Sequence, residues 1–212
     1  MTIPLEIIDL SKTYDTKEAV RDISFKVNEN EIIGILGPNG CGKTTTIGMI
    51  LGLLKPSKGR VLINGIEIEK QRVDLLNELN FISPYIELPK KLTVKQNLEV
   101  YGRLYDVKEL GIKIDYLCEK LRLNEFINKI TGELSSGQKN RVSLAKSIIN
   151  DPSVLLLDEP TASLDPETGD FVRSFLEEYQ KEKKASILLA SHNMSEVERS
   201  VSYTHLTLPT IA

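Results

Sequence analysis

The sequence predicts an α/β fold with a mostly parallel core sheet, an antiparallel β subdomain and an inserted helical subdomain. Three observations support this fold class. Two nearly continuous apolar runs, at residues 32–36 and 154–157, are typical of parallel strands that are buried on both faces. From residue 136 onwards, helical and strand patterns alternate along the chain, as they do around a parallel sheet. An Asn64-Gly65 pair between two short apolar runs indicates a hairpin, and therefore antiparallel strands.

The first third of the chain is predicted as β structure around one helix. Apolar residues alternate through residues 19–27, which is the pattern of a half-buried strand. The apolar run at residues 32–36 leads into a Gly-rich loop, and a helical pattern follows this loop. The expected elements are strands at residues 3–9, 19–27 and 32–36, a helix at 43–54, and hairpin strands at 61–63 and 66–68.

The rest of the chain divides into a helical insertion and a return to alternating helices and strands. Residues 83–133 form the predicted helical subdomain, which begins with a loop that contains two prolines. The last helix has the clearest start, because Asp165 suits an N-cap and Pro166 the first helical position. The expected elements are helices at residues 93–105, 112–122, 136–150 and 167–183, and strands at 79–82, 153–158 and 185–190.

The segment GPNGCGKT, between the third strand and the first helix, matches G-x-x-x-x-G-K-[ST], the phosphate-binding loop of P-loop NTPases. Glycine tolerates positive φ angles and close approach to a ligand, and we expect Gly37, Gly40 and Gly42 to use that freedom. The loop amides and the helix N-terminus would bind phosphate oxygens. Lys43 would reach the β and γ phosphates of a nucleotide, and Thr44 would hold Mg²⁺. The predicted nucleotide-binding residues of this segment are Gly37, Pro38, Asn39, Gly40, Cys41, Gly42, Lys43, Thr44 and Thr45.

A second part of the nucleotide site is predicted where the run at residues 154–157 ends in two carboxylates, Asp158 and Glu159. In open α/β sheets, ligands collect at the carboxyl ends of the strands. Asp158 would bind Mg²⁺ through water, and Glu159 would orient or deprotonate an attacking water. The alternative is a strand followed by a solvated acidic turn. The phosphate loop earlier in the chain favours the functional interpretation.

The composition is that of a globular chain that buries a substantial core. It has 212 residues, 41% hydrophobic and 27% charged, and a net charge of -3. Without a basic block, the sequence gives no electrostatic support for nonspecific binding to nucleic acid.

No apolar run reaches the about 18 residues of a membrane span, and no signal peptide is evident. Cys41 and Cys118 lack metal-ligand spacing and fit a reducing compartment. In the loop, Cys41 is more simply a small residue that fits than a thiol with a lowered pKa.

Over residues 3–199 the chain resembles the nucleotide-binding subunit of an ATP-binding-cassette (ABC) transporter, of the exporter type. The resemblance rests on motifs that follow one another in the family's order. GPNGCGKT resembles the family's phosphate loop, and LLLDEP at residues 155–160 resembles its second nucleotide motif. His192 resembles the switch histidine, and Tyr14 takes the place of the aromatic residue that stacks on adenine. Leu134, Ser135, Ser136, Gly137 and Gln138 resemble the signature motif, and Ser163, Leu164 and Asp165 resemble the D-loop.

The resemblance implies a mechanism and a set of partners. Two subunits, expected to be copies of one chain, would pair head to tail around two MgATP molecules. Each nucleotide would lie between one phosphate loop and the other subunit's signature motif. Glu159 and His192 would be the catalytic residues, with the histidine at the γ-phosphate. Hydrolysis would open the dimer and drive transport, by preference export, through a separate transmembrane permease. The chain would therefore work at the cytoplasmic face of the cell membrane.

Each motif also has a simpler interpretation. LSSGQ is compatible with an ordinary N-capped helix, His192 with a loop histidine, and Asp165 with a helix cap. Tyr14 is nearly as well explained as a half-buried aromatic residue at a strand end. Two other functions stay open. One is a soluble ATP-dependent interaction module, although such proteins usually carry two cassettes or long insertions, and the other is an ATP-binding regulator without turnover.

Two parts of the sequence depart from the family's pattern. The family usually has a glutamine after the strand at residues 79–82, where it contacts Mg²⁺ and the transmembrane partner. This chain has Ser83 followed by Pro84, which leaves Ser83 as a weaker candidate ligand for Mg²⁺. Residues 201–212 belong to a string, SVSYTHLTLPTIA, that resembles a translated sequencing adapter. We therefore expect a non-native tail outside the fold and a core that is partly uncovered, and the alternative is a genuine short tail.

Overall fold

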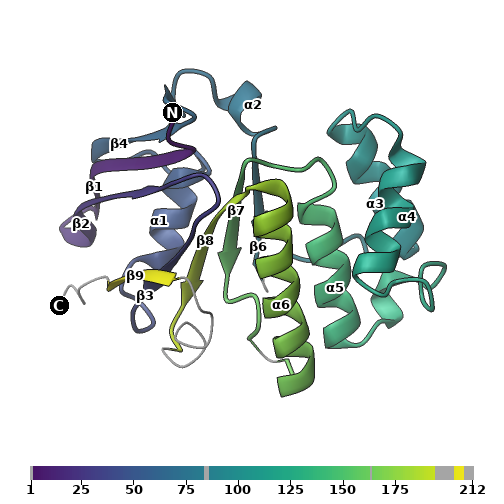
Figure 1. Ribbon diagram of the computed structural model, residues 1–212. Coiled ribbons are helices and arrows are strands. Elements are labelled where there is room, and N and C mark those ends of the chain that lie inside the picture. The colour runs from purple at the N-terminus through teal and green to yellow at the C-terminus, as the bar shows by residue number, and fades with distance from the viewer. Residues whose placement is uncertain (1, 84–85, 163, 194–202, 208–212) are drawn as a thin grey trace.

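The computed structural model describes residues 2–83, 86–162, 164–193 and 203–207, which form two sheets and their helices (Figure 1). In chain order the elements are β1 (Leu5–Tyr14), β2 (Lys17–Val27), β3 (Ile32–Leu36), α1 (Lys43–Ile50), β4 (Lys58–Ile63), β5 (Ile66–Glu67), α2 (Arg72–Leu75), β6 (Leu79–Ile82), α3 (Val94–Leu104), α4 (Leu110–Lys120), a 3₁₀ turn (Thr131–Glu133), α5 (Ser136–Ser147), β7 (Val154–Asp158), α6 (Pro166–Lys183), β8 (Ser186–Ser191) and β9 (Tyr203–Thr207). The predicted combination of parallel sheet, antiparallel subdomain and helical subdomain is confirmed.

The larger sheet is parallel and has the strand order β6-β7-β8-β3-β9. Every residue of β3, β7 and β8 is buried. Helix α1 packs on one face of this sheet, and α5 and α6 pack on the other (Figure 1). Burial on both faces explains why these strands appear in the sequence as continuous apolar runs instead of alternating ones.

The smaller sheet is antiparallel and has the strand order β2-β1-β4-β5. Its hairpin between β4 and β5 turns at Asn64 and Gly65, whose φ angles are 50° and 79°. Positive φ at both central residues is what a type I′ turn requires, so the predicted hairpin is confirmed. Helix α1 lies between the two sheets, and one apolar cluster joins it to both of them.

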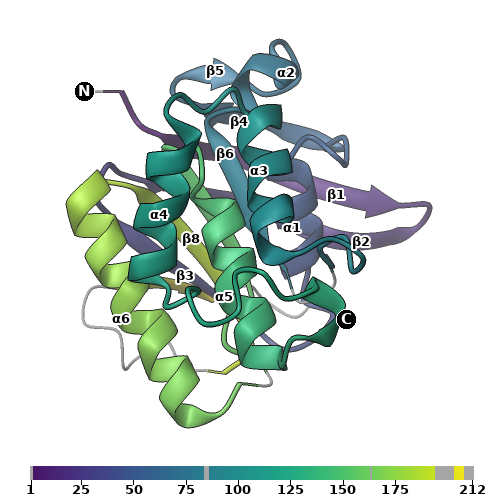
Figure 2. The same ribbon diagram turned by 90° about the vertical axis from the view of Figure 1, so that its right-hand side faces the viewer.

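Helices α3 and α4 of the helical subdomain lie at the side of the molecule away from the antiparallel sheet in Figure 1, and this side faces the viewer in Figure 2. Thr93 caps the start of α3 with its side chain. The buried Asn97 amide donates to the Thr131 hydroxyl at 2.8 Å and so links the start of α3 to the 3₁₀ turn. The Tyr105 hydroxyl donates to the Asn80 side-chain oxygen at 2.7 Å, which ties the subdomain to β6. In the described part of the chain, no helix combines the length and the apolar character needed to span a bilayer.

Several boundaries differ from the sequence prediction. Strand β1 continues to Tyr14 instead of ending at residue 9, because it keeps pairing with β2 through shifts in register. Helix α1 ends at Ile50 rather than at residue 54, and Gly52 follows with a φ of 63°. Helix α2 was not predicted, since one turn is too short to show a helical pattern.

Strand β9 lies in the segment that we expected to be outside the fold. It pairs in parallel with β3, from Ile32 opposite Tyr203 to Leu36 opposite Thr207. The edge of β3 is therefore paired, contrary to the expectation of an uncovered core on this side. The origin of residues 201–212 stays a prediction.

Candidate nucleotide site

The carboxyl ends of β7, β8 and β3 lie next to one another at one edge of the core sheet (Figure 1). The Gly-rich loop follows β3, Glu159 follows β7, and His192 follows β8. Neighbouring parallel strands bring these three segments together although they are far apart in the sequence. This edge is where ligands bind in open α/β sheets.

The loop between β3 and α1 depends on two glycines with positive φ angles. Gly40 has a φ of 85° and Gly42 a φ of 99°. Gly37 lies outside the positive region, which corrects one of the three predicted positions. A Cβ atom on Gly42 would lie 2.4 Å from the carbonyl oxygen of Ala19 in β2. The loop passes so close to β2 that only glycine fits at this position.

Helix α1 begins without a side-chain cap, because Gly42 occupies the N-cap. Its first amides therefore have no side-chain acceptor, and an anion would satisfy them. Lys43 is buried, and its Nζ donates to the carbonyl oxygens of Gly37 at 2.5 Å and Pro38 at 3.1 Å. An ammonium group has three donors, so one remains for a phosphate oxygen.

These groups line a cavity of about 180 Å³. The lining residues are Ala19, Asn39, Gly40, Gly42, Lys43, Thr44, Thr45, Asp158 and Glu159. The structure thus brings the predicted phosphate loop and both predicted carboxylates to one hollow, which we name the phosphate cavity. Cys41 does not line it, because its side chain is buried in the apolar cluster around α1. Its interpretation as a small residue that fits the loop is the one that this packing favours.

Asp158 is buried at the end of β7 and faces the phosphate cavity. Burial raises the pKa of its carboxyl group, Glu159 raises it further, and Lys43 opposes the shift. The Asp158 carboxylate and the Thr44 hydroxyl are oxygen donors of the kind that Mg²⁺ prefers. Within the described residues, no cluster of three or more His, Cys, Asp or Glu side chains could hold a metal. The donor set suits an ion whose remaining ligands are phosphate and water.

Glu159 and His192 are in direct contact. Glu159 Oε1 accepts a hydrogen bond from the His192 backbone amide at 2.9 Å and lies 2.6 Å from the ring Nδ1. Its Oε2 accepts from the Ser191 hydroxyl at 3.3 Å. The Glu159 side chain is 14% exposed and the His192 side chain 53%. The carboxylate is therefore held in place, while the ring remains accessible to a ligand.

The signature motif opens α5 and does not line the phosphate cavity of its own chain. Ser135 is the N-cap, and its hydroxyl accepts from the Gln138 amide at 3.2 Å. The Gln138 side chain accepts in return from the Ser135 amide at 3.0 Å, which completes a capping box. Leu134 is buried, whereas Ser135 and Ser136 are exposed. The interpretation as an N-capped helix is confirmed, and its exposed first turn is accessible to another molecule.

Of the predicted D-loop, Leu164 and Asp165 are described, and Ser163 lies outside the described residues. Asp165 caps α6, because its carboxylate accepts from the Thr168 amide at 2.9 Å and from the Thr168 hydroxyl at 2.7 Å. These hydrogen bonds hold the pKa of the Asp165 carboxyl below its ordinary value. The predicted helix cap is therefore confirmed, and the D-loop role stays a prediction.

A family model described as ABC transporter matches residues 20–162 of the chain. This chain belongs to the ABC transporter family. It is 34% identical over 201 residues to the ABC transporter ATP-binding protein NatA of Bacillus subtilis, with 92% of this chain and 81% of that protein covered. It is 38% identical over 200 residues to Nod factor export ATP-binding protein I of Rhizobium johnstonii, with 93% and 64% covered. The chain thus spans slightly less than two thirds of the second relative.

A solved structure agrees with this assignment. CbiO1 of Clostridium perfringens, described as part of the ABC transporter complex cbiONQ, is 30% identical and superposes with a TM-score of 0.87. The match covers 99% of this chain and 86% of that one. Within the ABC family the chain is an ATP-binding subunit, with the fold and motifs of the family's ATPases.

Tyr14 of this ABC cassette is the last residue of β1 and does not line the phosphate cavity. Its side chain is 44% exposed, and the Lys12 ammonium lies 5.0 Å from the ring centroid. The residue is a strand-end aromatic, as one of the two interpretations expected. The exposed ring leaves adenine stacking as a prediction.

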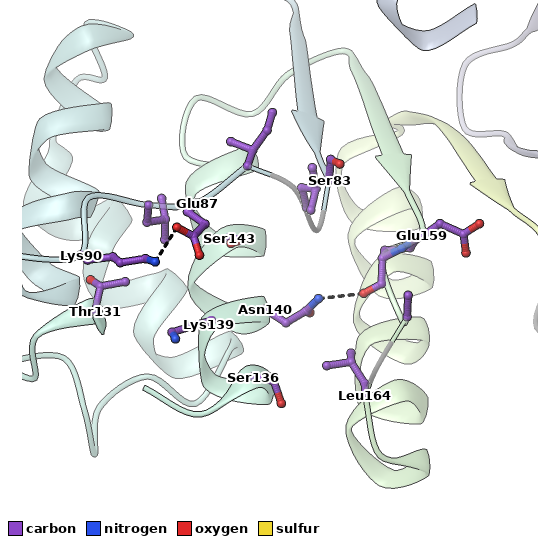
Figure 3. Close-up of a pocket in the computed structure, with 15 residues that line it drawn as sticks. Ser83, Glu87, Lys90, Thr131, Ser136, Lys139, Asn140, Ser143, Glu159 and Leu164 are labelled. Carbon is purple, nitrogen blue, oxygen red and sulfur yellow. Dashed lines mark hydrogen bonds and ion pairs between the residues drawn. The ribbon is translucent and has the colours of Figure 1, made fainter. Parts of the chain in front are cut away.

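Ser83, the weaker candidate ligand for Mg²⁺, lines a second cavity and not the phosphate cavity. This cavity, of about 310 Å³, lies between α5, the segment after β6 and the loop after β7 (Figure 3). We name it the interdomain pocket. Besides Ser83 it is lined by Ile82, Ile86, Glu87, Leu88, Lys90, Thr131, Ser136, Lys139, Asn140, Ser143, Glu159, Pro160, Ala162 and Leu164. Sequence reasoning missed it, because its residues come from segments whose proximity no local pattern encodes.

Proposed function

We propose that this ABC cassette binds MgATP in the phosphate cavity and hydrolyses it with Glu159 and His192 as catalytic residues. It would work as a head-to-tail dimer that drives export through a separate membrane subunit. The observation that carries the proposal is that the phosphate loop, Asp158 and Glu159 line one cavity, with His192 in contact with Glu159. The interdomain pocket has lysines and carboxylates but no residue of the Gly-rich loop.

The proposed chemistry is the transfer of the γ-phosphoryl group of ATP to water. The loop amides and Lys43 hold the phosphates, and Tyr14 stacks on the adenine. Glu159 orients the attacking water and accepts its proton as the oxygen bonds to the γ-phosphorus. The bond from that phosphorus to the bridging oxygen breaks, and ADP and phosphate leave. Mg²⁺, bound through Thr44 and Asp158, would neutralise charge on the phosphate oxygens.

The dimer is inferred from the position of the signature motif. Ser135, Ser136 and Gly137 lie at an exposed helix start that does not reach the phosphate cavity of the same chain. A helix start offers amides and a positive dipole end to a phosphate. A second copy placed head to tail would bring this helix start to the γ-phosphate, with Ser163, Leu164 and Asp165 at the interface.

The membrane subunit is inferred from the family and from the interdomain pocket. The family contacts its transmembrane partner in the segment after β6, and here that segment lines the pocket with Ser83 and the half-exposed Ile86. The relative named Nod factor export ATP-binding protein I supports export as the direction of transport. A cassette bound to a permease would lie at the cytoplasmic face of the membrane.

An ATP-binding regulator without turnover is the second candidate function. It is favoured by one observation, namely that Ser83 lines the interdomain pocket rather than the phosphate cavity. Ser83 would then supply no ligand to Mg²⁺. The two candidates differ in whether the purified chain hydrolyses MgATP.

The test is MgATP hydrolysis by wild type and by Glu159→Gln, with Glu125→Gln as the matched control. Glu125 carries the same charge but is exposed in the helical subdomain and does not line the phosphate cavity. We expect Glu159→Gln to bind ATP, to lose turnover and to accumulate as an ATP-bound dimer on gel filtration, while Glu125→Gln behaves as wild type. Turnover by Glu159→Gln equal to wild type would refute the catalytic assignment. Nucleotide binding by a wild-type chain without hydrolysis would favour the regulator.

A further inference from the structure

A side chain on α5 is bonded to the backbone directly after Glu159. Asn140 lies one turn into α5, and its Nδ2 donates to the carbonyl oxygen of Pro160 at 2.7 Å (Figure 3). The Glu159 side chain extends away from Asn140 in the same view. The bond therefore acts on the peptide backbone that carries the carboxylate and not on the carboxylate itself.

The backbone at Glu159 needs such support. Glu159 has a φ of 51°, in the left-handed region that residues with a Cβ adopt only when their surroundings hold them there. Two backbone hydrogen bonds help, from the Glu159 amide to the Ala190 carbonyl at 2.9 Å and from the Ala162 amide to the Glu159 carbonyl at 3.1 Å. The bond from Asn140 adds a restraint from a separate helix.

The oxygen end of the Asn140 amide indicates that the residue serves as a hydrogen-bond donor. Its Oδ1 is buried and has no hydrogen-bond partner among the described residues. Turning the amide over would place that oxygen against the Pro160 carbonyl oxygen, so only the donor side can face Pro160. Asparagine is also a poor residue for the interior of a helix. Its placement here is explained by the one hydrogen bond that it donates.

We infer that Asn140 is a positioning residue for Glu159, an inference that rests on the catalytic role proposed for Glu159. The helix that carries Asn140 begins with the signature motif. The bond therefore links two parts of the machinery, because α5 sets the position of the chain that bears Glu159. Movement of α5 against β7 would change the direction of the carboxylate.

The test uses two variants of Asn140. Asn140→Asp has the same shape but no donor, and it sets a carboxylate oxygen against the Pro160 carbonyl. We expect kcat to fall by roughly 10- to 100-fold, because small misplacements of a catalytic group have effects of this size. The KM for MgATP should stay within about twofold, since the phosphate loop is untouched. Asn140→Gln keeps an amide donor, and the interdomain pocket beside it has room for one methylene. We expect this variant to recover most of the wild-type kcat.

The matched control is Gln180→Ala. Gln180 is buried in α6, and its Nε2 donates to the Asn30 backbone carbonyl, before β3 and at the opposite edge of the sheet from Glu159. The variant loses the same kind of bond, from a side-chain amide to a backbone carbonyl, together with a second bond to the Asn30 side-chain oxygen. We expect its melting temperature to fall at least as far as that of Asn140→Asp, while its kcat stays within about twofold of wild type. If Asn140 only stabilised the fold, kcat would fall equally in Asn140→Asp and Gln180→Ala.

Hydrogen exchange at the Ala162 amide gives a readout that does not need turnover. Asn140→Asp should speed this exchange relative to wild type and to Gln180→Ala. Unchanged exchange, a kcat within twofold of wild type in Asn140→Asp, or no recovery in Asn140→Gln would each overturn the proposal. If wild type does not hydrolyse ATP but exchange rises in Asn140→Asp, the link to Glu159 stands and the proposed function fails.

Discussion

The two walls of the phosphate cavity are built in different ways. The loop wall, which the Gly-rich loop and the start of α1 form, comes from consecutive residues. Glycine φ angles and bonds from Lys43 to nearby carbonyls set its shape. The Glu159 wall depends on side-chain contacts from distant segments, namely His192 after β8 and Asn140 in α5. The part that would bind phosphate is therefore encoded largely by its own loop, together with the close approach of Gly42 to β2, whereas the part that would perform catalysis is encoded by tertiary packing.

The largest effect is expected where the loop wall touches β2. Gly42→Ala would force a Cβ to within 2.4 Å of the Ala19 carbonyl oxygen at a positive φ. We expect a loss of about 2 to 5 kcal/mol in the free energy of unfolding, from the left-handed conformation and the clash together. Gly40→Ala is the control, because Gly40 has a similar φ but open space around it. Its expected loss is about 1 to 2 kcal/mol. Urea unfolding measures both, and equal losses would contradict the contact with β2.

The Glu159 wall is tested next by His192→Ala. Removing the ring takes away the contact to Glu159 Oε1 and the proposed contact to the γ-phosphate. We expect kcat to fall by about 100-fold, the scale of one positioned acid–base group. Affinity for MgATP should change little, because the loop wall is intact. Steady-state kinetics measure the split, and a raised KM with an unchanged kcat would place His192 in binding rather than in catalysis.

This division also explains what the sequence could predict. The phosphate loop, Asp158 at a strand end and the cap of α6 at Asp165 follow local patterns, and the structure contains all three. The end of β1 could not be predicted, because it depends on a partner strand and on shifts in register. Strand β9 was missed because its segment was set aside for its resemblance to a translated sequencing adapter, whereas pairing with β3 gives it a structure.

The residues of the candidate site show the same difference between local patterns and tertiary contacts. Glu159 and His192 were each predicted, but their contact follows from the adjacency of β7 and β8, which no local signal states. Asn140 was not predicted at all, since a single asparagine in a helix has no pattern. The signal that would have found it is its poor fit to a helix interior.

Tyr14→Ala tests whether the site extends beyond the two walls. If the ring stacks on adenine, the dissociation constant for ATP should rise about tenfold, an effect of ~1.4 kcal/mol that is within the range for one stacked base. Tyr14→Phe keeps the ring and should bind as wild type. Fluorescence titration with a labelled nucleotide provides the measurement. Equal affinity in all three proteins would leave Tyr14 as a strand-end aromatic only.

The smallest effect concerns the cap of α6, outside both walls. The pKa of the Asp165 carboxyl is held below its ordinary value of 3.8, so its cap stabilises the fold above that pH. The stabilisation is lost as the pH falls through the lowered pKa. Asp165→Asn keeps a capping oxygen but does not titrate, and its melting temperature should fall less than that of wild type between about pH 6 and pH 3. Identical pH profiles would show that other groups dominate acid unfolding.

The most direct measurement of the division between the walls is a calorimetric titration of MgATP into Lys43→Ala and Glu159→Gln. Lys43→Ala loses at least one charge-assisted phosphate contact, so its dissociation constant should rise by about 10- to 150-fold. Glu159→Gln should bind as tightly as wild type while its turnover is abolished. Equal weakening in both variants, or unchanged affinity in Lys43→Ala, would contradict the account.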